Sequence, residues 1–80
     1  MRTAAHPLLP LPVVDSKNDA TIECVAAVGP LRARLSELGL IPGARIRVLH
    51  QGSPCILLVS GGARLCLRAD EADAILVQVA

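Results

Sequence analysis

Residues 35–48 read LSELGLIPGARIRV, and this stretch decides the fold because it holds a helix end, a turn and the start of a strand. Leucines recur before and within it at the spacing of one helical face, at Leu31, Leu35 and Leu38. Gly39 is a residue type that commonly ends a helix, and the Pro-Gly pair at 42–43 is typical of a turn. The stretch therefore predicts a short amphipathic helix that ends at Gly39 and a chain reversal soon after it.

After this turn the period of the hydrophobic pattern changes to two. Two alternating runs, residues 45–50 and 55–59, are separated by a four-residue loop, which predicts a β-hairpin. The loop length fixes a register with these pairs: Ile46 with Val59, Val48 with Leu57, and His50 with Cys55. One face of the hairpin is then apolar except at its end.

A second hairpin is expected at the glycines at 61–62. A two-residue loop would place Arg64 opposite Val59 and mix the two faces, so we predict a three-residue loop that includes Ala63. That loop gives these pairs: Val59 with Leu65, and Leu57 with Leu67. It sends three side chains to the opposite face: Arg64, Cys66 and Arg68.

The remaining segments complete a mainly-β fold. Residues 21–28 are rich in β-branched and small side chains and predict a first strand. Residues 70–74 indicate a single helical turn, and residues 75–79 indicate a last strand. Five or so short strands lose their exposed edges when the sheet closes. We therefore predict a small SH3-like barrel of about five strands, with one short helix inserted after the first strand and a short helical turn before the last.

The N-terminal segment differs from the rest of the chain. Residues 1–19 are Pro-rich and then polar, and we expect an arm that lies partly extended along the barrel, with residues 20–80 forming the domain. Its prolines interrupt the apolar run that a signal peptide needs, and no stretch approaches the ~20 apolar residues of a membrane span. We therefore expect a cytoplasmic protein without direct membrane insertion.

Composition restricts the classes of function. The 80 residues are 52% hydrophobic and include no Phe, Tyr or Trp, so the core must be aliphatic. The net charge is +1, and this balance together with the missing aromatic rings argues against nucleic acid binding. Three cysteines, an odd number, fit a reducing compartment. The acidic residues Asp70, Glu71 and Asp73 are expected on one exposed turn, and because no catalytic constellation is present we predict that the protein is not an enzyme.

The quoted stretch resembles the signature of the FeoA family, ferrous iron transport protein A. Residues 61–68, GGARLCLR, with Glu71-Ala72 and residues 75–77 after them, resemble the glycine hairpin, helical turn and closing strand of that family. The resemblance covers roughly residues 10–80. It implies a small cytoplasmic bacterial protein with an SH3-like fold that assists FeoB, a ferrous iron transporter with a cytoplasmic GTPase domain. Two alternatives stay open: an SH3-like regulatory module of the iron-dependent repressor type, and a small RNA-associated barrel.

The candidate partner-binding residues lie at the helix end and on the following strand: Leu38, Gly39, Leu40, Ile41, Pro42, Gly43, Arg45 and Arg47. Residues 38–43 are explained either by helix termination with core packing or by contact with a partner. On the second interpretation, we expect Leu40→Glu to abolish association with FeoB without unfolding the barrel. Arg45 and Arg47 share one strand face, which is either a solvated exterior or a basic patch for acidic protein surface or phosphate.

His50 and Cys55 are the candidate metal ligands, because the predicted register places their Cβ atoms ~5 Å apart. A structural zinc site needs four ligands, and no CxxC or HxxxH spacing supplies the others. We therefore expect no required cofactor and only weak or adventitious binding of zinc or ferrous iron. Cys24 is interpreted as a small buried hydrophobe and Cys66 as a bystander on the outer face. The sequence leaves the oligomeric state open.

Overall fold

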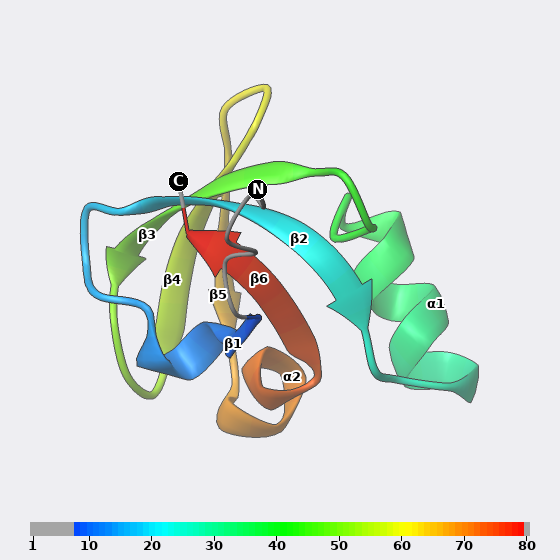
Figure 1. Ribbon diagram of the computed structural model, residues 1–80. Helices are drawn as coiled ribbons and strands as arrows, with labels where there is room; N and C mark the ends of the chain where they lie inside the picture. Colours follow the sequence, from blue (N-terminus) through cyan, green and yellow to red (C-terminus); the bar gives the residue numbers. More distant parts are fainter. Residues whose placement is uncertain (1–7, 80) are drawn as a thin grey trace, which may run out of the picture.

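The computed structural model describes residues 8–79 and consists of one strongly curved antiparallel sheet with two short α-helices (Figure 1). The elements in chain order are β1 (Leu9–Pro10), the 3-10 helix η1 (Leu11–Val13), β2 (Asp19–Val25), α1 (Gly29–Glu37), β3 (Arg45–His50), β4 (Cys55–Val59), β5 (Ala63–Leu67), α2 (Ala69–Asp73) and β6 (Ile75–Val79). The prediction of a mainly-β fold, with one helix before the hairpins and a helical turn before the last strand, is confirmed.

The sheet contains six strands in the order β1-β6-β2-β3-β4-β5, one more than the sequence suggested, because β1 pairs with β6. In Figure 1, β2 and β6 lie side by side and the sheet curls away from them through β3 and β4 to β5. Within the described residues β1 and β5 are the two edges, so hydrogen bonds do not complete the closed barrel that we expected. Strong curvature allows the sheet to enclose a core without that last ladder.

Helix α1 matches its prediction. Pro30 lies in the first turn, where its missing N–H costs nothing, and the helix ends at Glu37, two residues before Gly39. Leu35 is fully buried, and Leu31 and Leu38 pack against the core. The leucine spacing therefore identified the correct helical face.

The β3–β4 hairpin confirms two predicted pairs, Ile46 with Val59 and Val48 with Leu57. The third prediction is wrong, because His50 is paired with Ile56 instead of Cys55. A register shift between Val48 and His50 inserts one additional residue into β3, as a β-bulge does, and such irregularities leave no periodic signal.

The β4–β5 hairpin has the predicted faces but a different register. Val59 pairs with Ala63 and Leu57 with Leu65, so β5 is displaced by two residues from the expected alignment. The loop has three residues, as predicted, but it consists of residues 60–62 and excludes Ala63. Gly61 and Gly62 both adopt positive φ there, and the Gly62 amide donates to the Val59 carbonyl at 2.9 Å. A shift of two residues preserves the face of every side chain, so alternation alone does not detect it.

Strand β2 spans Asp19–Val25, where residues 21–28 were expected. A register shift between Ile22 and Cys24 turns two consecutive side chains, Glu23 and Cys24, toward solvent. Cys24 is therefore exposed, and the prediction that it is buried is wrong. Cys66 is exposed on the outer face, as expected.

The core is aliphatic throughout and draws on every strand of the sheet except β1. Its fully buried larger members include Leu11, Ile22, Leu35, Leu40, Leu57, Leu67 and Ile75. The segment after β1 contributes Leu11 and Val14 to this core. Residues 1–7 of the predicted arm lie outside the described residues. Within residues 8–79, neither α-helix has the length and apolar character needed to cross a bilayer.

Candidate partner-binding site

The chain that leaves α1 is fixed by hydrogen bonds at each step. Gly39 adopts φ +89°, and the Leu40 amide donates to the Leu35 carbonyl at 2.9 Å, which closes the helix end. The Gly43 amide donates to the Ile22 carbonyl at 2.7 Å, and the Ala44 amide donates to the Ile41 carbonyl at 3.0 Å. The turn between α1 and β3 is therefore attached to β2 and holds its side chains in fixed positions.

The side chains of this turn divide between the core and the surface. Leu40 is 1% exposed and Leu38 is half-buried against the core, whereas Ile41 is 47% exposed. Pro42 and Gly43 are also exposed, and we name Ile41, Pro42 and Gly43 the helix-end surface. The expectation for Leu40→Glu has to be corrected, because a charge at this buried position would disrupt the core. Ile41 is the large apolar side chain of this turn that lies at the surface.

A small hollow of about 50 Å³ adjoins the helix-end surface. It is lined by Val25, Arg32, Ser36, Leu40, Ile41 and Pro42. The Arg32 guanidinium crosses from α1 to β2 and donates from Nη1 to the Val25 carbonyl at 3.2 Å. The hollow is an apolar recess with a polar wall and is of the size that a single side-chain tip would fill.

Arg45 and Arg47 both lie exposed on the outer face of β3, as predicted, but they differ in their partners. Arg47 binds Asp19 through two of its guanidinium nitrogens, Nε to Oδ1 at 2.7 Å and Nη2 to Oδ2 at 3.3 Å. This hydrogen-bonded pair lowers the pKa of Asp19 and raises the pKa of Arg47. Arg45 has no ion pair within residues 8–79 and presents an unneutralised charge.

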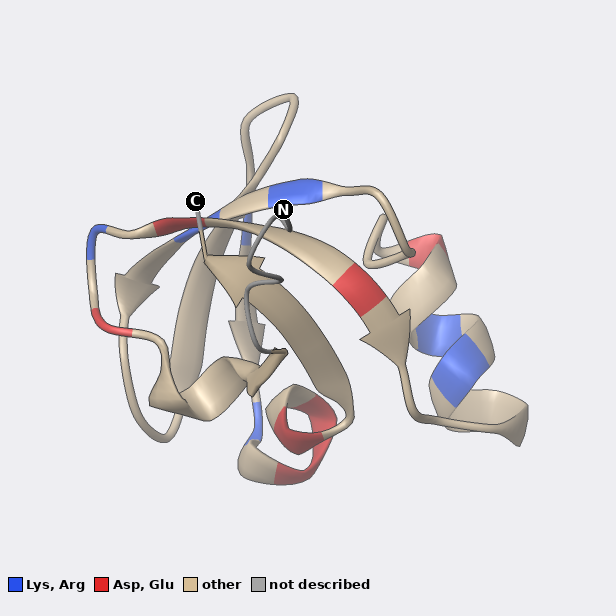
Figure 2. Ribbon diagram, viewed as in Figure 1, with Lys and Arg blue, Asp and Glu red and all other residues tan. Residues whose placement is uncertain are grey.

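An open groove of about 400 Å³ runs beside these two arginines. Its walls come from three strands and the β4–β5 turn, and its lining residues are Asp19, Ala20, Thr21, Arg45, Ile46, Arg47, Leu58, Val59, Ser60, Gly61 and Gly62. Blue segments of β3 and β5 in Figure 2 show that basic residues occur on both strands at this end of the sheet.

The structure does not bring the two candidate metal ligands together. His50 is exposed and its Nδ1 lies 3.3 Å from the Gln51 carbonyl, whereas Cys55 is buried in the core. Burial raises the pKa of the Cys55 thiol and so disfavours the thiolate that binds metals. Residues 8–79 contain no group of three or more His, Cys, Asp or Glu side chains placed to hold a metal ion.

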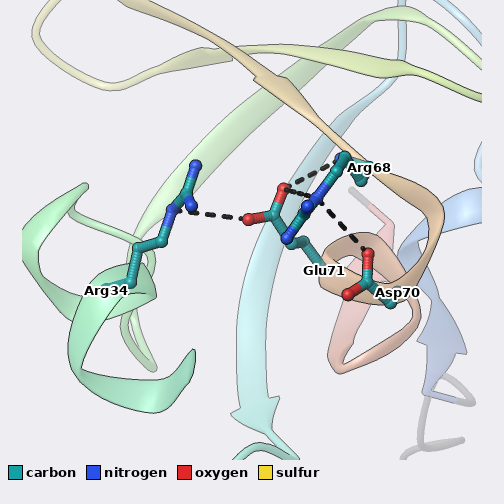
Figure 3. A network of polar contacts seen from close by, with 4 residues as sticks. All are labelled: Arg34, Arg68, Asp70 and Glu71. Carbon is teal, nitrogen blue, oxygen red and sulfur yellow. Dashed lines mark hydrogen bonds and ion pairs between the residues drawn. The ribbon is translucent and has the colours of Figure 1, made fainter. Parts of the chain in front are cut away.

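Glu71 is a buried carboxylate that the sequence did not reveal. Asp70 and Asp73 are exposed on α2 as expected, but Glu71 is 1% exposed and lies between two arginines (Figure 3). Its Oε1 accepts from the Arg68 amide at 2.9 Å, and its Oε2 lies 3.4 Å from Arg34 Nε. The only signal in the sequence is a Glu at the third position of a short helix, where it can cap the first turn.

The Arg34 contact links two elements that are far apart in the chain. Arg34 belongs to α1 and Glu71 to α2, and Oε2 of Glu71 has no hydrogen bond of good geometry within the described residues. The ion pair therefore provides the main compensation for burying this oxygen. It also links α1 to α2, and the C-terminal end of α1 leads into the helix-end surface.

Comparisons with known proteins agree with this architecture. A family model of the FeoA domain matches residues 9–79. An iron uptake regulatory protein (FeoA) superposes with a TM-score of 0.85 at 26% identity, covering 92% of this chain and 100% of that chain. A search of the curated proteins finds no match.

Two further solved structures bear on metal binding and on the alternatives. FeoA from Stenotrophomonas maltophilia, complexed with zinc and described as an SH3 domain protein, gives a TM-score of 0.76 at 27% identity and covers 88% of this chain and 89% of that chain. IdeR from T. acidophilum gives a TM-score of 0.85 at 22% identity and covers 99% of this chain but 37% of that chain. The likeness to IdeR concerns the fold alone. The predicted SH3-like fold is confirmed.

Proposed function

This chain belongs to the FeoA family, and we propose that it is a cytoplasmic accessory protein of bacterial ferrous iron uptake that binds the cytoplasmic part of a FeoB-type GTPase transporter. The FeoA family is associated with ferrous iron transport, and this association supports a role of the chain in iron uptake. The partner and the compartment are our proposal. A binding role, without catalysis, is consistent with the side chains at hand, since the one buried carboxylate is already held by two arginines.

The helix-end surface is the observation that carries this proposal. Ile41 is a large apolar side chain that is half exposed on a turn whose backbone is hydrogen-bonded to β2. A rigid apolar side chain loses little conformational entropy on binding, and such side chains often anchor protein interfaces. Leu38 and Leu40 pack against the core beneath the turn, and Arg45 and Arg47 follow the turn on β3, where both are exposed.

The test measures binding to the purified cytoplasmic domain of the FeoB-type transporter from the same genome. Ile41→Asp is expected to weaken binding at least about tenfold while the thermal midpoint stays close to wild type. Val13→Asp is the matched control, because Val13 is 54% exposed and lies on η1, away from the turn. Absence of binding by the wild-type protein would contradict the proposal. Equal binding by Ile41→Asp would show that the surface is assigned to the wrong residues.

The consequence of binding is tested by GTP hydrolysis and iron uptake by the transporter, measured with and without this protein. A change in either rate that is lost in Ile41→Asp is the expected result. An unchanged rate with proven binding would restrict the role to assembly of the transporter.

Metal binding is not required in this proposal. The zinc in the Stenotrophomonas maltophilia relative belongs to that protein, and His50 and Cys55 here lie on opposite sides of the sheet. We expect weak or adventitious binding of zinc or ferrous iron at most. Isothermal titration of the wild type and His50→Ala with each ion tests this, and a stoichiometric site lost in His50→Ala would contradict it.

A further inference from the structure

The outer face of β3, β4 and β5 carries a row of residues that the register aligns. Arg47 pairs with Leu58, and Leu58 pairs with Arg64, so Leu58 lies between two arginines. Paired residues on neighbouring strands share one face of a sheet, with Cβ atoms ~5 Å apart. Arg45 projects from the same face one step along β3, and its carbonyl accepts from the Ser60 amide at 3.0 Å. We name Arg45, Arg47, Leu58 and Arg64 the arginine-flanked face.

The charges on this face are only partly neutralised. Arg45 and Arg64 make no ion pair within residues 8–79, and Asp19 neutralises Arg47. Three arginines and one aspartate leave a local charge of 3 − 1 = +2, although the whole chain carries only +1. Leu58 is 36% exposed at the centre, and the groove of about 400 Å³ runs past it. An apolar centre with a cationic rim is complementary to an acidic segment that carries an apolar side chain.

We propose that the arginine-flanked face binds an acidic peptide segment of the transporter partner, with carboxylates at Arg45 and Arg64 and one apolar side chain against Leu58. This inference rests on the proposed function. Arg45, Arg47 and Leu58 of this face also line the groove, so a segment seated there meets cationic and apolar side chains together.

Neither a nucleic acid nor a lipid surface fits these residues as well. Nucleic acid binding draws on many phosphate contacts, whereas this face offers a local charge of only +2. Binding to an anionic bilayer grows with the number of basic residues and with apolar insertion, and this face offers two arginines without ion pairs in the described part of the chain, around a single exposed leucine. A short peptide needs only the contacts that are present.

The deciding experiment uses a short peptide of alternating glutamate and leucine, titrated into the 15N-labelled full chain. We expect amide shift changes confined to residues 45–47 and 58–64, and several-fold weaker binding when salt rises from about 50 mM to about 300 mM. The same peptide with glutamine for glutamate should bind at least about threefold more weakly. Shift changes elsewhere, or equal binding of the two peptides, would overturn the inference.

Matched variants separate the local charge from the net charge. Arg64→Gln and Ala33→Glu each lower the net charge by one unit, and Ala33 is exposed on α1. Peptide binding should fall at least about threefold in Arg64→Gln and stay unchanged in Ala33→Glu. Equal losses in both would mean that only overall charge matters, and the inference would fail. Tighter binding to phosphatidylserine vesicles than to the peptide would overturn it in favour of a lipid surface.

The transporter domain distinguishes this inference from the proposed function. If the domain binds the wild type and Arg64→Gln equally while Ile41→Asp loses binding, the proposed function stands and the arginine-flanked face is not part of it. If the glutamate peptide binds this face and the domain does not bind at all, the proposed function fails, and the assignment of the transporter as the source of the acidic segment fails with it. Loss of domain binding in both Ile41→Asp and Arg64→Gln supports the proposed function and the role of the arginine-flanked face.

Discussion

Arg34→Met tests how far the buried carboxylate of Glu71 depends on the guanidinium of α1. The substitution removes the cation 3.4 Å from Glu71 Oε2 and leaves that oxygen buried. Two unit charges ~4 Å apart attract by about 4 kcal/mol at an effective dielectric constant of ~20. The Arg34 side chain is 60% exposed, so solvent screens much of this attraction, and Arg68 remains 3.7 Å from Oε1. We therefore expect a loss of about 1.5 kcal/mol in the free energy of unfolding, within the range of coupled neighbours.

Urea unfolding followed by far-ultraviolet circular dichroism measures this loss, since the chain has no Trp or Tyr to report by fluorescence. With a slope near 1 kcal/mol per molar urea, the midpoint should fall by about 1.5 M. Met and Arg have similar helix propensities, so α1 itself should be little affected. Arg64→Met is the control, because Arg64 is exposed and lacks an ion pair within residues 8–79.

Glu71→Gln completes a double-mutant cycle with Arg34→Met. Gln keeps an acceptor for the Arg68 amide but carries no charge, so Glu71→Gln should destabilise the wild type more than it destabilises Arg34→Met. A coupling free energy near 1 kcal/mol is expected. The prediction is refuted if Arg34→Met loses no more stability than Arg64→Met and if the effects of Arg34→Met and Glu71→Gln are additive. The ion pair would then not offset the burial of Glu71.

Three further predictions follow from other positions. The lowered pKa of Asp19 means that its stabilising effect is present above the unfolded pKa of about 3.9 and is lost as pH falls through the lower folded value. Urea midpoints of wild type and Asp19→Asn should therefore differ at neutral pH and converge toward about pH 2, and a constant difference would contradict this. Cys24 and Cys66 are exposed, whereas Cys55 is buried and its pKa is raised. A thiol reagent at neutral pH should therefore modify Cys24 and Cys66 quickly and Cys55 only on unfolding. Equal rates of modification at all three cysteines would contradict this prediction. Gly39→Ala should lower the free energy of unfolding by about 1 kcal/mol, because alanine is disfavoured at the φ of +89° that Gly39 adopts. A steric clash should add nothing, since the new Cβ would lie 3.7 Å from Val59 Cγ1, an ordinary contact. A loss of several kcal/mol in urea unfolding would contradict this.

Local signals in the sequence were sufficient for most of the elements. The leucine spacing located α1, the Gly39 stop located its end, and alternation assigned the inner and outer faces of β3, β4 and β5. Alternation cannot distinguish alignments of neighbouring strands that differ by two residues, because such a shift leaves every side chain on the same face. The displaced β5 is an example. The bulges in β2 and β3 were also missed, because an extra residue in a strand depends on packing against the partner strand.

The candidate site was only partly predictable for the same reason. The helix end was correctly placed, but which of Leu40 and Ile41 faces the core depends on how the turn is attached to β2 by the bond from Gly43 to Ile22. The burial of Glu71 arises from a contact with Arg34 on another element, and no local pattern encodes it. The membership in the FeoA family was recognisable because its signature is a continuous stretch.

The pairing of β2 with β6 has a consequence for how the chain folds. These two strands are neighbours inside the sheet, yet they come from residues 19–25 and 75–79, so their ladder joins segments near opposite ends of the sequence. Such non-local pairing slows folding, since the loop must close before its contacts stabilise it. During synthesis the two hairpins formed by β3, β4 and β5 can assemble early. Strand β2 can then pair with β3, but β6 cannot join the sheet until residues 75–79 have left the ribosome, and until then β2 exposes one unpaired edge to other nascent chains.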